Sequence, residues 1–191
     1  MYKQLFDHIK KTSPEYTEED LNNLLRYFNI KKVSKGDTIV KAGSICRNGN
    51  FVVEGCFRYF TINSDGVEFN TQFAFEDYWM GDMPGILNNI PSKINIQALE
   101  DSTLLTISAT DYNYLLKNSH SFALYKFRLR TNSYHARIEH SNEFHESAEI
   151  RYLNLLSKYP NIIQRVSQYH IASYLGITPE SLSRLRKKLA K

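Results

Sequence analysis

The chain has 191 residues, of which 42% are hydrophobic, and a formal net charge of +4. This length suffices for one domain or two small ones with a real core, and we expect two. No apolar run approaches the roughly 20 residues that span a bilayer. The N-terminus also lacks the apolar core of a secretory signal, so we expect a cytoplasmic protein.

The first thirty residues predict two short helices. Apolar residues keep helical spacing at Leu5 and Ile9, and again between Leu21 and Phe28. Ser13-Pro14 marks a stop between the two segments, and the acidic run after Thr17 marks a new start.

The segment from about Lys31 to Ile107 predicts a β-rich domain. Its apolar period changes to two, and turn residues recur at short intervals, as in Lys35-Gly36-Asp37 and Ala42-Gly43-Ser44. Short strands at this spacing are typical of a β-sandwich or barrel. Cys46 and Cys56 lie in this segment without a Cys-x-x-Cys motif, which argues against a disulfide framework or an iron–sulfur cluster.

The clearest predicted strand runs from Val67 to Phe75. Apolar residues and one threonine alternate with mostly polar residues along it, so we expect one set of side chains to face the core: Val67, Phe69, Thr71, Phe73 and Phe75. Asp65-Gly66 precedes the strand, and Arg58 to Ile62 lies beyond that turn. The two segments therefore predict a hairpin.

A long helical zone follows from about Ala109 to Tyr159. It carries two apolar stripes that lie nearly back to back: Phe122, Tyr125, Leu129, Asn132 and Ala136 form the first, and Leu124, Phe127, Thr131, Tyr134 and Ile138 form the second. One stripe could cover the β-rich domain and the other a second copy of the chain. A helix buried on both sides within a monomer is the alternative.

The segment from Gln168 to Lys188 predicts a helix-turn-helix. Ile171, Ala172 and Leu175 form the inner face of a first helix, and Gly176 can supply the positive φ of the turn. Thr178 can cap the second helix, and Pro179 suits its first position. An ordinary helical hairpin with a solvated basic face is the alternative.

The second helix of this motif has two different faces. Leu182, Leu185 and Leu189 share one side, and Glu180, Arg184 and Lys187 share the other. Glu can accept from cytosine, Arg can bind guanine through two hydrogen bonds, and Lys suits phosphate. Six basic residues and one acid lie from Arg165 to Lys191, so the attraction to a polyanion is concentrated at this end.

The order of these parts resembles the Crp/Fnr family of bacterial transcription regulators. The matching segments are Lys35-Gly36-Asp37, Ala42-Gly43-Ser44, Val53 to Arg58, Asp65-Gly66, and Ile171 to Lys188. The resemblance implies an α+β fold with an N-terminal β-roll, jelly-roll-like and of the cyclic-nucleotide-binding-domain type, with flanking helices. A long dimerisation helix and a C-terminal helix-turn-helix of the winged-helix type would follow.

The resemblance also implies domain limits and a wing. The effector-type domain would cover residues 1–118, the dimerisation helix 119–146 and the DNA-binding domain 147–191. Any β-hairpin wing beside the second helix would lie around Ile162 to Val166.

Site residues follow from the same resemblance. The DNA-binding residues would be Gln168, Thr178, Pro179, Glu180, Ser181, Ser183, Arg184, Lys187 and Lys188. Pro179 departs from the arginine common there among relatives that bind guanine, so we expect a different or looser operator. The first stripe, Phe122, Tyr125, Leu129, Asn132 and Ala136, would form the dimer interface.

The expected effector pocket also departs from the family pattern. Its residues would be Phe73, Trp79, Gly81, Asp82, Met83, Ser92 and Lys93. Asp82 or Met83 replaces the glutamate that binds ribose, and Ser92-Lys93 replaces the arginine that binds the cyclic phosphate. Neither reproduces a bidentate arginine–phosphate contact, so we expect no cyclic AMP binding. The effector stays unidentified, and aromatic side chains could fill the pocket instead.

The expected partners are double-stranded DNA, a second copy of the chain and RNA polymerase. No catalytic motif or metal-ligand spacing appears, so we expect no enzyme, catalytic residue or metal site. A small-molecule sensor whose helix-turn-helix serves protein contacts is the alternative function.

Overall fold

Two antiparallel four-stranded sheets form the centre of the N-terminal domain. The computed structural model describes residues 1–143 and 145–189, without the side chains of residues 137 and 139–143. The first sheet has the order β1-β8-β3-β6 and the second the order β2-β7-β4-β5. The strands are β1 (Asn29–Val33), β2 (Thr38–Val40), β3 (Asn48–Glu54), β4 (Phe57–Ile62), β5 (Glu68–Ala74), β6 (Trp79–Met80), β7 (Asn95–Ala98) and β8 (Ser102–Ser108). The predicted β-rich domain is confirmed as a β-roll.

Helices flank this β-roll at both ends of its sequence, and one short helix, α3, lies between β6 and β7. They are α1 (Tyr2–Thr12), α2 (Glu18–Leu25), α3 (Met83–Asn88) and α4 (Ala109–Asn118). Thr17 begins α2 with a capping box, in which its hydroxyl accepts from the Asp20 amide and the Asp20 carboxylate accepts from the Thr17 amide. The two short N-terminal helices that the spacing predicts are therefore confirmed.

The hairpin of β4 and β5 forms as predicted, but the faces of β5 differ from the prediction. Tyr59 pairs with Gln72 and Phe60 with Asn70, so an irregularity in the register lies at Thr71. A bulged residue shifts the alternation of the side chains that precede it. Val67 and Phe69 are exposed as a result, and Asn70 is buried. The prediction that Val67, Phe69 and Thr71 face the core is wrong.

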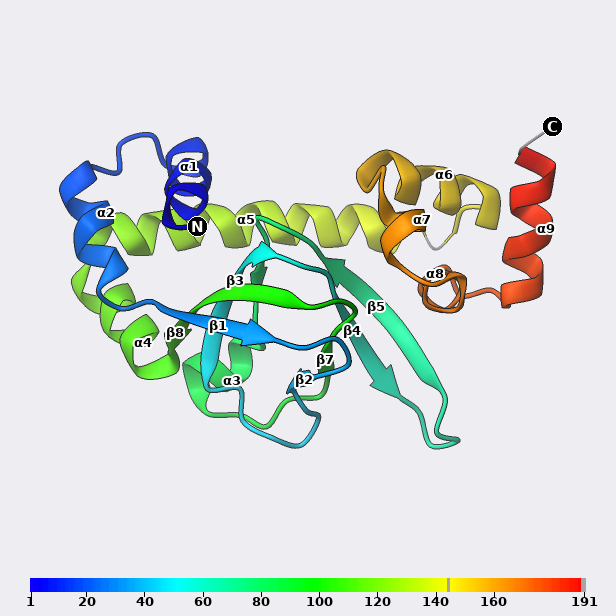
Figure 1. The fold of residues 1–191 in the computed structure, drawn as a ribbon, viewed down its shortest axis with the longest axis horizontal. Helices are drawn as coiled ribbons and strands as arrows, with labels where there is room; N and C mark the ends of the chain where they lie inside the picture. The colour runs from blue at the N-terminus through cyan, green and yellow to red at the C-terminus, as the bar shows by residue number, and fades with distance from the viewer. Residues whose placement is uncertain (144, 190–191) are drawn as a thin grey trace.

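The long helix α5 (His120–Glu143) runs across the β-roll and continues beyond it toward the C-terminal helices (Figure 1). Phe122 and Tyr125 belong to the core of the β-roll and have no exposed surface within a single chain. They cannot also contact a second copy in this conformation. The side chains of Phe122 and Tyr125 therefore cover the β-roll, which departs from their predicted place in the dimer interface.

The C-terminal part consists of helices only, within the described residues up to 189. These are α6 (Ala148–Lys158), α7 (Ile162–Arg165), α8 (Gln168–Tyr174) and α9 (Pro179–Leu189). The segment expected to hold a wing forms the helix α7 instead, so the prediction of a β-hairpin wing there is wrong. Figure 1 places α9 at the end of the molecule opposite α1 and α2.

Candidate nucleic-acid interface

The turn between α8 and α9 has the geometry that the sequence predicts. Ser167 caps α8, since its hydroxyl accepts from the amide of His170 at 3.3 Å. Gly176 has a φ of +66°, a value that glycine adopts without the steric penalty of a Cβ. The amide of Ile177 then donates to the Ala172 carbonyl at 3.0 Å and closes the turn. Ala172 is fully buried where the two helices meet.

The second helix begins at the predicted residues. The Thr178 hydroxyl accepts from the amide of Ser181 at 3.2 Å, as an N-cap residue does, and Pro179 occupies the first helical position. Leu182 is fully buried against α8, and Leu185 packs against the same cluster. The apolar side of α9 is thus anchored to α8, which fixes the direction of its other side.

The polar side of α9 faces solvent. Of the nine residues predicted to contact DNA, eight are exposed and Ser183 is half-buried. A hydrogen bond to its own amide, then one from Thr178, lowers the pKa of Glu180, so this carboxylate is ionised. Lys188 differs from the others because its ammonium forms an ion pair with Glu149 of α6 at 2.6 Å. Glu180, Arg184 and Lys187 are left as an outward row.

The helix-turn-helix is docked on the β-roll through an apolar contact. Phe73 of β5 packs on Tyr174 of α8 with ring centroids 5.3 Å apart, and Phe75 packs on Tyr159 at 5.0 Å. Phe73 and Cys56 join the same buried cluster as Ile171 and Leu182. One buried apolar cluster therefore spans the contact between the β-roll and the C-terminal helices.

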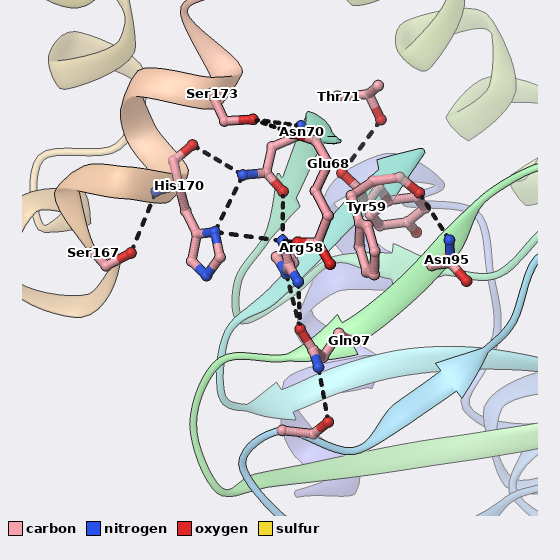
Figure 2. A network of polar contacts seen from close by, with 12 residues as sticks. Arg58, Tyr59, Glu68, Asn70, Thr71, Asn95, Gln97, Ser167, His170 and Ser173 are labelled. Carbon is pink, nitrogen blue, oxygen red and sulfur yellow. Dashed lines mark hydrogen bonds and ion pairs between the residues drawn. The ribbon is translucent and has the colours of Figure 1, made fainter. Parts of the chain in front are cut away.

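A polar network lies beside this contact, and Figure 2 shows His170 and Ser173 of α8 directed at β4 and β5. The side-chain amide of Asn70 donates to the His170 carbonyl at 3.0 Å, and the Asn70 backbone amide donates to the Ser173 hydroxyl at 3.0 Å. The Ser173 hydroxyl in turn donates to the backbone carbonyl of Glu68 at 3.1 Å. These bonds fix the position of α8 along β5.

Arg58 supports the network from below. It is buried and forms an ion pair with Glu68 at 2.5 Å, and it donates twice to the Gln97 side chain, at 2.9 and 2.7 Å. Its Nη1 also lies 3.4 Å from Nδ1 of His170. Asn70 Nδ2 lies 3.3 Å from the same nitrogen. Because both neighbours are donors, His170 Nδ1 is the acceptor and this imidazole is neutral.

A second set of charges connects α7 to the β-roll. Arg165 forms ion pairs with Glu76 and Glu100. Burial alone would raise the pKa of Glu76, but hydrogen bonds from Arg165 and from the Gly55 amide outweigh it, and the net pKa lies below its ordinary value. Both acids precede or follow strands of the β-roll, so the pairs restrain the rotation of the C-terminal helices.

The residues expected to form an effector pocket are divided among separate parts of the structure. Phe73 lies in the interdomain core, and Trp79 packs on Phe51 and donates to Tyr125 of α5. Asp82 caps α3, and Ser92 is buried and exchanges hydrogen bonds with the backbone of Ile94. Phe73 and Trp79 thus pack among other apolar side chains, and their place in an effector pocket stays a prediction.

The remaining residues expected in the effector pocket differ in burial and in their contacts. Gly81 and Asp82 border Cys46, and the Ser92 amide donates to the Ser44 carbonyl. Met83 is half-buried, and Lys93 is exposed. The hydroxyl of Ser92, at the place where an arginine would hold a phosphate, is already bonded to its own segment.

Comparison with known proteins agrees with this architecture. Residues 30–119 match the cyclic nucleotide-binding domain. FixK2 from Bradyrhizobium japonicum has a TM-score of 0.72 at 17% identity, over 85% of this chain and 84% of that one. A Crp/Fnr regulator from Eubacterium rectale has a TM-score of 0.72 at 19% identity, over 93% and 85%. No curated protein matches the chain significantly in sequence.

The catabolite activator protein of Thermus thermophilus is also similar, with a TM-score of 0.55 at 20% identity over 96% of this chain and 86% of that one. The class is therefore an α+β protein with a β-roll, a long helix and a helix-turn-helix. Residues 30–119 match the cyclic nucleotide-binding domain, and the chain as a whole has the fold of the Crp/Fnr regulators.

Two further observations concern membrane-spanning helices and metal-binding groups. No described helix is both long and apolar enough to cross a membrane. Within the residues that the structure describes, no group of three or more His, Cys, Asp or Glu side chains is arranged to hold a metal ion.

Sequence reasoning missed the residues that dock the two domains. Arg58 was the available signal, because it stands inside the apolar strand Phe57 to Phe60, where a buried cation requires partners. The identity of those partners was not available, since Asn70 and His170 are 100 residues apart and meet only in the folded chain.

Proposed function

We propose that the protein is a DNA-binding transcription regulator of the Crp/Fnr type that acts as a homodimer. One observation carries the proposal: α9 is anchored by buried Leu182, while Glu180, Arg184 and Lys187 extend from its opposite side into solvent. An exposed row of this kind, on the second helix of a helix-turn-helix, suits the major groove of DNA. The basic C-terminal segment adds an attraction to phosphate.

The three side chains have distinct roles in this proposal. Arg184 forms two hydrogen bonds with guanine, Glu180 accepts from a cytosine amino group, and Lys187 contacts phosphate. Because Glu180 precedes Arg184 by one helical turn, the two can contact neighbouring base pairs. Lys188 contributes less, since Glu149 already neutralises its charge.

The second stripe of α5 is the surface that we assign to dimerisation. Phe127 is 67% exposed and Tyr134 is 64% exposed, and Ile138 also lies open. Together with Leu124 and Thr131 these positions repeat at alternating spacings of three and four, which is the pattern of a two-stranded coiled coil. A dimer formed through this stripe would carry two α9 helices for successive major grooves about 34 Å apart.

The experiment that tests the function starts with selection of sites from random duplex DNA. The selected site should be near-palindromic, and its affinity should fall steeply as salt rises. Arg184→Ala should weaken binding by about 1–3 kcal/mol and relax the base preference. Lys187→Ala should weaken all duplexes alike. Lys35→Ala, an exposed lysine of the β-roll, is the matched control and should have no effect.

Two outcomes would contradict the proposal. If no duplex is selected and no binding appears at low salt, the alternative stands, in which the helix-turn-helix contacts another protein. If binding occurs but Arg184→Ala changes neither affinity nor preference, a different surface contacts the bases.

We further propose that DNA binding does not respond to cyclic AMP. The support is the hydroxyl of Ser92, which is buried and hydrogen-bonded to the backbone of Ile94. At this position the cyclic phosphate would need a guanidinium group. Cyclic AMP should change neither the operator affinity nor the melting temperature.

A further inference from the structure

Lys126 of α5 is a buried cation without an anionic partner. The residue is 4% exposed, and no carboxylate of the described residues forms an ion pair with it. Its ammonium lies 2.8 Å from the centroid of the Trp79 ring. The rings of Tyr112, Tyr125 and Phe122 surround it at 5.2, 5.3 and 5.5 Å. Aromatic faces attract a cation, but they supply no counter-charge.

Burial without a counter-charge disfavours the charged form of a lysine. Desolvation accordingly lowers the pKa of Lys126 well below its ordinary value. An apolar side chain of the same length would fill this space without that desolvation cost. The position therefore calls for a partner from outside the chain.

A groove of about 530 Å³ opens beside Lys126, between α3, α4 and α5. Leu87, Tyr112 and Leu116 line one part of it, and Phe127 and Tyr134 line the part formed by α5. The described lining residues include two basic side chains, Lys126 and Arg130, and no acid. Volumes of roughly 300–1,000 Å³ are typical of sites for small organic ligands.

We propose that this groove binds a small amphipathic monoanion, namely an aliphatic or aromatic carboxylate. The apolar body would lie against Leu87, Tyr112 and Leu116, and the carboxylate would lie between Lys126 and Arg130. Lys126 has a flexible four-carbon stem, so its ammonium can turn from the Trp79 ring toward a ligand in the groove. The anion supplies the counter-charge that the protein lacks at this place.

A second copy of the chain is the competing occupant, since Phe127 and Tyr134 also belong to the proposed dimer stripe. That stripe consists of Leu124, Phe127, Thr131, Tyr134 and Ile138, and it contains no acid. A partner helix could cover the rim of the groove, but its stripe could not neutralise Lys126. Arg130 and the unpaired Lys126 amine, which an anion would help to protonate, thus favour a small anion at the base of the groove, whether or not the protein binds DNA.

The test uses octanoate and phenylacetate as probes, with octanol and 2-phenylethanol as uncharged counterparts. Trp79 is the only tryptophan of the chain, so its fluorescence reports directly on the ammonium beside it. Carboxylate binding should be saturable and change this fluorescence, with an affinity at least about tenfold higher than that of the matched alcohol. Calorimetry on the intact protein should give the same ranking.

Three variants complete the test. Lys126→Met should lose at least about tenfold in carboxylate affinity, and Lys126→Arg should keep part of it. Lys117→Met, at an exposed lysine of α4, should bind as the unaltered protein does. The Lys126→Met protein should fold, because methionine fills the same space without a buried charge, and thermal melting checks this.

The proposal is overturned by any of three results. Absence of saturable binding into the millimolar range would mean that the groove is closed, as it would be if the second copy filled it. Equal affinity for carboxylate and alcohol would show that the groove binds ligands through apolar contact alone. Unchanged carboxylate affinity in a folded Lys126→Met protein would place the anion elsewhere.

Discussion

The guanidinium group of Arg165 holds the carboxylate of Glu76 through two hydrogen bonds of 2.7 Å each. Arg165 belongs to α7, and Glu76 follows β5, so the pair joins the C-terminal helices to the β-roll. Because Glu76 also accepts from the Gly55 amide at 2.9 Å, the pair is anchored to the backbone of the sheet domain. A bidentate pair of this kind fixes orientation as well as distance.

Removing this guanidinium should loosen the docking of the helix-turn-helix. Arg165→Met is expected to lower the free energy of unfolding by about 1–2 kcal/mol, since charge-assisted hydrogen bonds are lost while the pair is partly solvated. The radius of gyration from small-angle scattering should increase. Arg26→Met, at an exposed arginine after α2, is the control. Equal dimensions for the Arg165 and Arg26 variants would show that the apolar contact alone holds the domains.

Acidification should weaken the same docking through His170. Burial first, and then the charge of Arg58, lower the pKa of His170 below its ordinary value of 6.5, while Glu68 raises it. The undocked histidine therefore takes up a proton at a higher pH than the docked one. The stability from neutral His170 is complete above pH 6.5, and it is lost as pH falls toward the lower folded pKa.

His170→Asn isolates this contribution, because an asparagine carbonyl can accept from Arg58 and Asn70 without titrating. The unfolding free energy of the unaltered protein should fall more steeply below pH 6.5 than that of His170→Asn. The comparison is needed because burial also lowers the pKa of His8. Parallel pH profiles for the two proteins would exclude His170 as the titrating group.

Local sequence patterns predicted where helices and strands form better than they predicted which face of each element packs against another. The cap at Thr178, the turn at Gly176 and the buried Leu182 all depend on neighbours within one helical turn, so spacing was sufficient to find them. The face of β5 was predicted wrongly because a bulge at Thr71 reverses the alternation, and no local signal marks a bulge in a strand without glycine.

The two stripes of α5 show the same limit. Periodicity identified both stripes, but it could not decide which one covers the β-roll, because that depends on where α1 and β6 lie in space. The structure decides it through Tyr125, whose hydroxyl accepts from Trp79 Nε1 at 2.8 Å and lies 2.8 Å from His8 Nδ1. The stripe of Phe127 and Tyr134 is left exposed.

A charge on the exposed stripe should separate the proposed dimer. Phe127→Glu would place a carboxylate opposite its own copy across a two-fold axis, where like charges repel and apolar burial is lost. Light scattering should then give the mass of a monomer. Ile30→Glu replaces an apolar residue of β1 that is 50% exposed, and it should stay dimeric. A dimeric Phe127→Glu protein would refute the pairing through this stripe.

Gly55 should be the position at which a single added methyl group damages the interdomain contact most. Its φ is +122°, and a Cβ there would lie 2.0 Å from the Ser102 hydroxyl and 3.0 Å from the Ser102 Cα. Gly43 has a φ of +83° with no atom within 4 Å of such a Cβ, so Gly43→Ala measures backbone strain alone. That strain should cost about 1–2 kcal/mol of unfolding free energy in Gly43→Ala and at least as much in Gly55→Ala, whose φ lies further from the left-handed helical region. Gly55→Ala should add about 1–3 kcal/mol from overpacking, because Ser102 lies on β8 inside the sheet and cannot move freely.

The same substitution should also weaken the Arg165–Glu76 pair, because the Gly55 amide donates to Glu76 and the added methyl group displaces this backbone. Gly55→Ala should therefore show the same larger radius of gyration as Arg165→Met. Chemical denaturation and scattering measure both effects, and equal losses for the two glycine variants would show that β8 yields to the methyl group.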